Sequence, residues 1–365
     1  MEEKKDQNLS LNLNLNSNLY QDFADKIFDI FGDTSKLPKN FAVALSGGCD
    51  SMALTFLLQE FCQKHQINLI AVIIDHQMRL NSLAEAKAVV ALLQKHQIQH
   101  KIIQINQENL PKSNIEAVLR DLRYELLYNF CCENNIKHLF LGHHIGDIAE
   151  NFIIRLFRGS GLDGLSLMSE SSHYKDIVLV RSLLDFYKSQ FVDYLNMRNI
   201  SWFEDPTNED EKFLRNRIRN FIKFLPDYEL IQKRVKKASE EITEIRDLFD
   251  ELVAKNAKEM LQRRGDSYLI NKDKFIKADK KIALKILALI LMELGQKSYK
   301  PRFTKLNNFY NHIIESGGEP KRRNFYGCIL ANYDENFIII SCEENDNVKR
   351  SHIFSKSKIQ ELLES

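Results

Sequence analysis

The hexapeptide S-G-G-C-D-S at residues 46–51 has the residue types and the setting of a phosphate-binding loop. It follows the apolar run FAVAL and precedes an amphipathic stretch. Two successive glycines let the backbone turn sharply and approach phosphate oxygens, while amides at a helix start and serine hydroxyls donate to them. We therefore predict that a polyphosphate is bound by Ser46, Gly47, Gly48, Cys49, Asp50 and Ser51. The alternative is an ordinary Gly-Gly turn between a strand and a helix.

The loop also carries a carboxylate, Asp50, at the predicted start of the following helix. Negative charge so close to phosphates is repulsive unless a cation lies between them, which predicts a magnesium ion at Asp50. Helix capping by this carboxylate is an alternative that is compatible with the first. The chain has no G-x-x-x-x-G-K-[ST] sequence, so its loop is not predicted to transfer a terminal phosphoryl group.

A second group of chemical residues is the stretch G-H-H-I-G-D-I-A-E-N at 142–151. His143 and Asp147 are four residues apart, so on a helix they share one face and can converge on the same phosphate or metal ion. The alternative is a pair of solvated surface residues.

Two arginines follow each other at helical spacing in N-I-E-A-V-L-R-D-L-R-Y at 114–124. Arg120 and Arg123 lie on one helix face, and the guanidinium fork suits phosphate oxygens. The alternative for Arg120 is an ion pair with Glu116, one turn earlier on the helix surface.

Positive charge is concentrated between residues 212 and 237, although the formal net charge of the chain is only +1. The bases are Lys212, Arg215, Arg217, Arg219, Lys223, Lys233, Arg234, Lys236 and Lys237. Such a segment favours nucleic acid binding, because the local charge decides it. A solvated helix face is the alternative.

The elements that must position these residues follow an alternating pattern. Apolar runs at 41–46, 67–75, 100–106, 138–144 and 177–180 predict strands, and amphipathic stretches at 51–65, 82–96, 113–134 and 145–157 predict helices between them. This alternation is typical of a parallel sheet covered by helices, an α/β fold. Ligands bind beyond the carboxyl ends of such strands, so Ser46, Asp75 and His143 are predicted to meet at one crevice.

The remaining segments differ in character. Residues 8–19 alternate Leu with Asn or Ser and are predicted to be a mobile extension, with a helix beginning near Tyr20 and closing at Gly32. After about Trp202 the sequence becomes helical and charged, which indicates a second domain, and residues 281–294 are a strongly apolar helix candidate. The runs FYGCIL and FIIISC near the end predict a β-hairpin.

Bulk composition restricts the class of protein. A length of 365 residues with 44% hydrophobic and 28% charged residues is ordinary for a globular protein of more than one domain. No apolar run reaches the roughly 18 residues of a membrane span, and the charged N-terminus does not resemble a secretory signal, so we expect a cytoplasmic protein without a membrane partner. The six cysteines form no C-x-x-C pair, so neither a zinc ribbon nor an iron–sulfur site is predicted.

Taken in order, several motifs resemble one enzyme family. The S-G-G-x-D-S loop is that of N-type ATP pyrophosphatases, which adenylate an oxygen and then displace AMP. Together with it, the chain has I-D-H-Q-M-R at 74–79, G-H-H-I-G-D at 142–147, R-L-F-R-G-S-G-L-D-G-L-S-L-M at 155–168, V-R-S-L-L at 180–184, W-F-E-D-P-T-N at 202–208 and L-R-N-R-I-R at 214–219. This series is similar to that of tRNA(Ile)-lysidine synthases, and it covers about residues 41–220.

The resemblance implies a fold and a reaction. The fold is a Rossmann-like, adenine nucleotide alpha hydrolase-like domain. The reaction joins free L-lysine to C2 of the wobble cytidine of tRNA(Ile) with a CAU anticodon, through an adenylated cytidine, and consumes ATP to AMP and pyrophosphate. The product, lysidine, changes codon recognition from AUG to AUA. ATP and Mg²⁺ are the implied cofactors, and the oligomeric state stays open, with a homodimer as one alternative.

The resemblance also implies roles for individual residues. Asp50 and Asp147 would position magnesium and ATP, while His143, Arg120 and Arg123 would stabilise charge on the α-phosphate. Arg158 and the turn 159–164 would shape the cavity for the base or the lysine. Contacts to tRNA phosphates are expected from Arg215, Arg217 and Arg219.

The implied domains are an extension at 1–19, a catalytic domain at 20–205, a helical tRNA-binding domain at 206–295 and a small C-terminal α+β domain at 296–365. Two departures from the family pattern are Ser182, where R-P-L-L has proline, and the lack of a K-L-F…P-P-W-x-R stretch near the end.

Two alternative functions stay open. One is a related tRNA thiolase, although sulfur transfer uses cysteine pairs or a cluster, and this chain offers only the adjacent Cys131 and Cys132. Amide-forming ligases on the same fold would need an ammonia source. The other is a catalytically inactive tRNA-binding protein, which the complete set Ser46, Asp50, Ser51, His143 and Asp147 disfavours.

Overall fold

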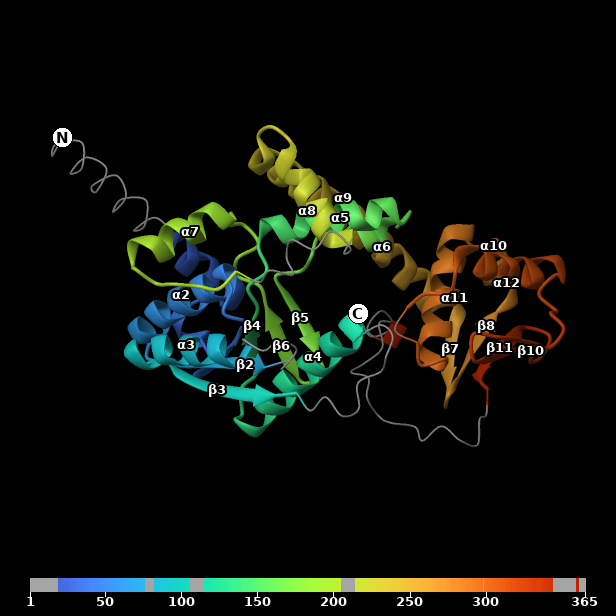
Figure 1. Cartoon of the computed structure of the whole chain (residues 1–365). Coiled ribbons are helices and arrows are strands. Elements are labelled where there is room, and N and C mark those ends of the chain that lie inside the picture. Colours follow the sequence, from blue (N-terminus) through green and yellow to red (C-terminus); the bar gives the residue numbers. More distant parts are fainter. Residues whose placement is uncertain are drawn as a thin grey trace. The chain divides into compact units, whose positions relative to one another are not determined.

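The computed structural model describes residues 19–75, 82–105, 115–204, 214–297, 299–343 and 359–360 (Figure 1). The chain folds as two compact units, residues 1–242 and 243–365. The division falls inside the segment 206–295 that the sequence predicts as one helical domain. Each unit has a hydrophobic core of its own.

The first unit contains a six-stranded sheet with helices around it. Its strands are β1 (Asn40–Leu45), β2 (Asn68–Asp75), β3 (Gln99–Gln104), β4 (His138–Phe140), β5 (Ser171–Tyr174) and β6 (Ile177–Val180), in the order β3-β2-β1-β4-β6-β5. All neighbours are parallel except the antiparallel pair of β5 and β6. The predicted α/β fold is confirmed, and the one strand that the sequence pattern does not predict is β5.

Helices precede, connect and follow these strands. They are η1 (Thr34–Lys36), α2 (Cys49–His65), α3 (Ser82–Lys95), α4 (Ile115–Glu133), α5 (Ile145–Phe157), α6 (Leu162–Leu165) and α7 (Lys188–Met197). Side chains of β1 alternate between two cores: Phe41, Val43 and Leu45 pack with α2 and α7, whereas Ala42 packs with α4. This period of two places helices on both faces of the sheet.

A helix already covers residue 19 and continues to residue 31, and the amide of Gly32 donates to the carbonyl of Phe28 at 2.7 Å, as predicted for a helix end. Leu19 is helical and 4% exposed, so it is not part of a mobile extension. The rest of that predicted extension, residues 1–18, lies outside the described residues. No helix in the described part of the chain is long and apolar enough to cross a membrane.

Two helices follow the sheet: α8 (Leu214–Phe224) and the long α9 (Tyr228–Met260). Ile218 and Ile222 of α8 are buried in a small cluster with Ala149 of α5, and Val235 of α9 packs against the same cluster. The apolar spacing of α8 therefore fixes which of its faces lies against α5.

In its described residues, the second unit contains the last part of α9 and a five-stranded antiparallel sheet with further helices. Its elements are β7 (Leu261–Arg264), β8 (Ser267–Asn271), α10 (Lys272–Lys277), α11 (Lys280–Leu294), α12 (Phe303–Glu315), β9 (Arg323–Phe325), β10 (Cys328–Asn332) and β11 (Phe337–Cys342), with the strand order β7-β8-β11-β10-β9. The predicted hairpin is the pair β10–β11, and the predicted apolar helix is α11. Strands β7 and β8 lie where the sequence predicts a helical domain, and Leu261, Tyr268 and Ile270 of these strands are part of the core of this unit.

Candidate functional site

The loop 46–51 connects β1 to α2 at the carboxyl edge of the sheet. Ser46 and Ser51 hold its two ends together: the Ser46 amide donates to Ser51 Oγ at 3.2 Å, and the two hydroxyl oxygens are 3.0 Å apart. Ser51 Oγ donates to the carbonyl of Gly48 at 3.0 Å. The predicted serines therefore fix the loop from within.

The start of α2 has no side-chain cap. Its N-cap is Gly48, which carries no side chain, so the first amides of the helix point to the loop without a side-chain acceptor. Gly47 has a φ of +83°, which only glycine adopts without strain. An uncapped helix start at the carboxyl edge of a parallel sheet is an anion site by its dipole and its amides.

The end of β4 approaches this helix start closely. A Cβ atom on Gly142 would lie 3.2 Å from the amide nitrogen of Ser51 and 3.3 Å from the carbonyl carbon of Asp50. Because β1 and β4 are neighbours, the loops that follow them meet where the sheet changes its direction of winding. Ser46, Asp75 and His143 thus lie at the same edge of the sheet, and their meeting at one crevice stays a prediction.

Asp50 has a buried oxygen, Oδ1, that accepts no hydrogen bond within the described part of the chain. Its other oxygen, Oδ2, is 3.7 Å from Nε2 of His144. Burial raises the pKa of the Asp50 carboxyl, an effect that His144 and Lys188 partly offset. An unpaired buried oxygen is costly in an isolated protein, so it marks a place for a ligand.

His144 is a site residue that the sequence analysis missed. It is the N-cap of α5: Nδ1 accepts from the amide of Gly146 at 3.0 Å, and the Asp147 carboxylate accepts from the amide of His144 at 3.0 Å. Because Nδ1 accepts, Nε2 carries the proton and faces the carboxylates of Asp50 and Asp147, at 3.7 and 3.8 Å. The adjacent pair His143-His144 was the available signal, but the helix boundary that separates their roles is not visible in it.

Both oxygens of Asp147 accept hydrogen bonds from this chain. One accepts from the backbone of His144, and the other from Arg215 Nη2 at 2.7 Å. Burial alone would raise the pKa of Asp147, but His144, His143 and Arg215 lower it to about 2. Asp147 is therefore ionised and fixed before any ligand arrives.

Two of the arginines predicted to contact tRNA are used inside the unit. Arg215 Nε donates to Glu150 at 2.8 Å, and Arg219 Nη2 donates to the same carboxylate at 3.2 Å. Glu150 is buried, so these pairs attach α8 to α5. Arg217 is exposed on another face of α8 and has no partner within the described part of the chain.

A cationic group surrounds His143. Nδ1 of His143 is buried without a partner among the described residues. Burial lowers the pKa of His143 to about 4. The positive charge of Arg181, Arg120 and Arg215 also lowers it, and Asp147 raises it. Arg181 Nε is likewise buried without a partner, while Nη1 donates to the Ser169 carbonyl at 3.0 Å. Arg181 belongs to the V-R-S-L-L motif at 180–184, but no role was predicted for it from the sequence.

Of the two predicted arginines of α4, Arg120 acts on His143, and Arg123 lies near Arg120. Arg120 Nη2 donates to the Tyr124 hydroxyl at 3.4 Å, and the Arg123 guanidinium lies 5.6 Å from the centre of the Tyr124 ring. Neither has a carboxylate partner among the side chains that the structure describes; the side chain of Glu116 lies outside them. Burial lowers the pKa of Arg123, which remains a cation at any physiological pH.

Arg158 lies at the opposite end of α5 from His144. It is exposed and follows a 13-residue helix, so about 20 Å of helix separates it from His144. The structure therefore does not bring Arg158 to the loop, and its predicted contact with substrate would be made at a distance from Asp50. Nearby, Arg155 Nη1 donates to the carbonyl of Gly164 at 2.8 Å and holds the turn that follows α5.

The predicted magnesium site can be compared with the carboxylate oxygens that lie near the loop. Among the described residues, no group of three or more His, Cys, Asp or Glu side chains could hold a metal ion. Asp50 fits as a single protein ligand because its Oδ1 is unpaired, and Mg²⁺ commonly takes one or two carboxylates plus phosphate oxygens. Asp147, predicted as a second ligand, is already occupied by Arg215 and by its own helix start.

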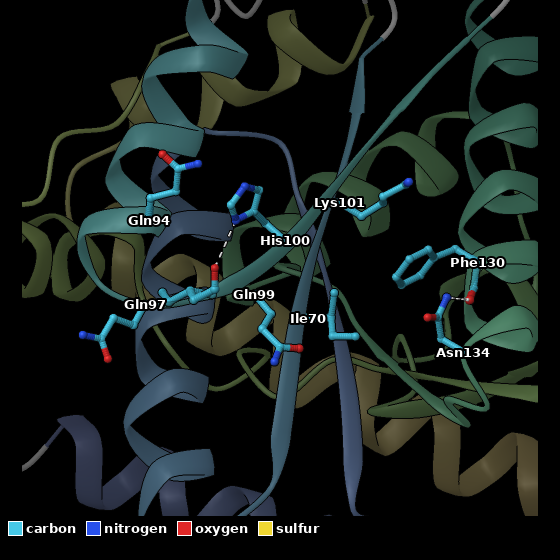
Figure 2. A pocket seen from close by; sticks show the side chains of 9 residues that line it. Ile70, Gln94, Gln97, Gln99, His100, Lys101, Phe130 and Asn134 are labelled. Carbon is cyan, nitrogen blue, oxygen red and sulfur yellow. Dashed lines mark hydrogen bonds between the residues drawn. The ribbon is translucent and has the colours of Figure 1, made fainter.

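A cavity of about 500 Å³ lies elsewhere, at the amino edge of the same sheet (Figure 2). It is bordered by the starts of β2 and β3 and by the ends of α3 and α4, including Ile70, Gln99, His100, Phe130 and Asn134. Asn134 Nδ2 donates to the Phe130 carbonyl at 2.8 Å. None of the predicted site residues lines it, so it is not the site of the loop.

Sequence comparisons agree with this geometry. Residues 19–225 match the model of the PP-loop domain family. The chain is 33% identical to the tRNA(Ile)-lysidine synthase of Wolbachia pipientis wMel over 82% of this chain and 70% of that protein, and 32% identical to that of Orientia tsutsugamushi over 90% and 75%. This chain belongs to the tRNA(Ile)-lysidine synthase family. The family that the sequence motifs resemble is thereby confirmed.

Among solved structures, a U34-tRNA thiolase from Methanococcus maripaludis, determined with its 4Fe-4S cluster, superposes with a TM-score of 0.51. It is 20% identical and the match covers 61% of this chain and 78% of that one, so it supports the fold alone. In this chain Cys49 and Cys131 are buried, and burial raises the pKa of each thiol to about 12. Neither of these two thiols is therefore a thiolate at neutral pH. Members of the tRNA(Ile)-lysidine synthase family are ATP-dependent ligases.

Proposed function

We propose that this protein ligates free L-lysine to C2 of the wobble cytidine of a CAU-anticodon tRNA(Ile), with release of AMP and pyrophosphate. The observation that carries the proposal is that a member of the tRNA(Ile)-lysidine synthase family retains an uncapped phosphate loop beside a buried, unpaired carboxylate oxygen of Asp50. Both features fit ATP and a cation.

In the first step, O2 of the cytosine attacks the α-phosphorus of ATP, and the bond to the bridging oxygen breaks as pyrophosphate leaves. The amides at the start of α2, with Ser46 and Ser51, would hold the phosphates. Arg120, Arg123 and Arg181 would stabilise negative charge at the α-phosphate. His143, neutral at pH 7 because its pKa is lowered to about 4, would act as a neutral hydrogen-bonding group there.

In the second step, the ε-amine of lysine attacks C2 and loses a proton, and the C2–O2 bond breaks as AMP leaves with O2. Adenylation turns a poor leaving group into a good one, so two easier steps replace a difficult one. The fixed carboxylates of Asp147 and Glu150, with Arg215 and Arg219 around them, would orient the groups at this point.

A magnesium ion, when bound, would neutralise phosphate charge. Asp50 would hold it, together with phosphate oxygens of ATP. Asp147 would act by fixing His144 and Arg215, which is a positioning role rather than the metal-ligand role that the motif suggests.

The alternative functions make different demands. A thiolase of the cysteine-pair type would need two reactive thiols, whereas in the pair Cys131–Cys132 only Cys132 is exposed, and burial raises the pKa of Cys131. An inactive tRNA-binding protein would bind the same tRNA without turning over ATP, which only an assay distinguishes. The cytoplasmic location and the assembly state stay predictions.

The test is incubation of the protein with labelled lysine, ATP, magnesium and CAU-anticodon tRNA(Ile), following label into RNA and pyrophosphate release together. Asp50→Asn removes the charge and keeps the size of the side chain, so it should reduce both signals by on the order of 100-fold. Asp193→Asn, at an exposed residue of α7, is the matched control and should leave both unchanged.

Each outcome has a distinct meaning. Pyrophosphate release without label would retain adenylation and reject lysine as the nucleophile. Binding of tRNA with neither signal would favour the inactive binding protein. Full activity of Asp50→Asn would remove Asp50 from the site.

A further inference from the structure

Helix α8 has two faces with different chemistry. Ile218 and Ile222 are buried against α5, and Arg215 and Arg219 on the same side pair with buried carboxylates. The opposite side carries Arg217, Phe221 and Phe224. These three positions have the spacing i, i+4 and i+7, so they form one stripe along the helix, which we call the α8 stripe.

The aromatic members of the α8 stripe are exposed. Phe221 is 53% and Phe224 is 88% exposed. In the part of the chain that the structure describes, no hydrogen bond, ion pair or ring contact involves either phenylalanine or Arg217. Single exposed apolar residues are common, but two phenyl rings aligned with an unpaired arginine form a surface of defined composition.

The charge of α8 selects the kind of partner. The helix has four basic residues and no acidic one. Arg215 and Arg219 are neutralised by Asp147 and Glu150, which leaves Arg217 as the free charge on the stripe, and Lys223 is exposed on an adjoining face of the helix. Of the acidic residues just after the helix, Glu229 accepts from Ser189 Oγ at 2.7 Å, and Asp227 is exposed. The surface is therefore complementary to a polyanion with flat apolar groups.

We infer that the α8 stripe is a stacking surface for unpaired bases of a single-stranded RNA loop, with Arg217 on the adjoining phosphate. The inference rests on the proposed function, in which that loop is the anticodon loop of the tRNA. Protein aromatic rings stack on unpaired bases of any sequence, while paired bases are not accessible to them.

The position of the stripe fits a loop that also enters the site. Arg215 and Arg219 reach the carboxylates beside His144 from one face of α8, and the stripe lies on the other face of the same helix. A helix with its side chains is about 10–12 Å across. Neighbouring nucleotides of one loop can therefore contact the stripe while the wobble cytidine enters the site.

The test measures binding of two fluorescently labelled RNAs to the full chain by anisotropy: a CAU anticodon stem–loop, and a fully paired duplex of equal length. Phe221→Ala/Phe224→Ala should weaken binding of the stem–loop by about 5-fold to 150-fold for each stacked base that is lost, and should leave binding of the duplex unchanged. Phe221→Tyr/Phe224→Tyr should restore stem–loop binding. Arg217→Ala should weaken the binding of both RNAs and should reduce the slope of log affinity against log salt concentration by about 1.

Phe303→Ala is the control, because Phe303 is a 70% exposed phenylalanine at the start of α12. The inference would be overturned if Phe221→Ala/Phe224→Ala lost the same affinity for the duplex as for the stem–loop. It would also be overturned if Phe303→Ala lost as much stem–loop affinity as that variant. A third result would also overturn it: sedimentation shows that the wild type is a dimer and that Phe221→Ala/Phe224→Ala is a monomer with unchanged RNA affinity. The stripe would then be a contact between two copies of the chain. Lysine transfer by the wild type tests the proposed function separately. If the wild type transfers lysine and Phe221→Ala/Phe224→Ala binds the stem–loop as tightly as the wild type does, only the inference about the α8 stripe is rejected.

Discussion

Asp147 is a residue whose contribution to stability depends on pH. Its pKa is lowered to about 2, so the folded state favours the ionised form more than the unfolded chain does, where an Asp titrates near 3.9. The stabilisation is therefore complete above about pH 5 and is lost as the pH falls from about 4 towards 2.

We predict that Asp147→Asn lowers the free energy of unfolding by about 1–3 kcal/mol at pH 7, because Arg215 loses one of its two carboxylate partners and keeps Glu150. The difference from the wild type should shrink below about pH 4. Urea unfolding of both proteins at several pH values measures it. A difference that stays constant down to pH 2 would contradict the assigned pKa.

Sequence spacing predicted Asp50, His143 and Asp147 as site residues, but it did not predict that His144 lies between the carboxylates of Asp50 and Asp147. The motif contains two adjacent histidines, and only the position where α5 begins decides that one becomes the N-cap. Likewise, the partners of Arg215 and Arg219 lie more than 60 residues earlier in the chain. Local composition therefore could not distinguish an internal arginine from a free one such as Arg217.

At the scale of elements, the close contact of β4 with α2 depends on the missing side chain of Gly142. A Cβ there would press on backbone atoms of Asp50 and Ser51, at 3.2–3.3 Å, and backbone cannot move aside as a flexible side chain can.

We predict that Gly142→Ala lowers the free energy of unfolding by about 1–3 kcal/mol and weakens ATP binding, since the start of α2 must shift. Isothermal titration with ATP and thermal unfolding measure the two effects. Gly161→Ala is the control, because a Cβ at Gly161 meets no atom within 4 Å, and it should leave ATP affinity unchanged. Unchanged affinity in Gly142→Ala would show that the loop tolerates the shift.

Strands β1, β2, β4 and β6 were predictable because they are largely buried and read as continuous apolar runs, and the edge strand β3 was predictable from the short apolar run Ile102–Ile103. Strand β5, with the sequence SSHY, was not predictable, since an edge strand that is partly exposed needs no apolar run. Its pairing comes from β6, which supplies the ladder of hydrogen bonds.

At the scale of the whole molecule, the chain has two units with separate cores. The boundary after residue 242 lies within α9, where a continuous helix conceals it from any pattern of loops or glycines. The predicted boundaries at 205 and 295 rest on the family resemblance and on the change in composition, and they remain predictions.

We predict that residues 1–242 alone fold cooperatively and bind ATP within about 3-fold of the full chain, because the loop and its supporting clusters belong to this unit. Expression of this fragment, urea unfolding and titration with ATP measure it. A fragment without a cooperative transition would show that residues after 242 complete the first core.

The segment after α7 returns to the phosphate loop: the amide of Phe203 donates to the carbonyl of Gly47 at 2.9 Å. Its neighbour, Trp202, is the only tryptophan among 365 residues and packs partly buried against the main core. Any rearrangement of the loop backbone is therefore transmitted to a single indole. With the indole excited selectively over the 12 tyrosines, tryptophan fluorescence is expected to change when the loop binds a ligand, without any added label.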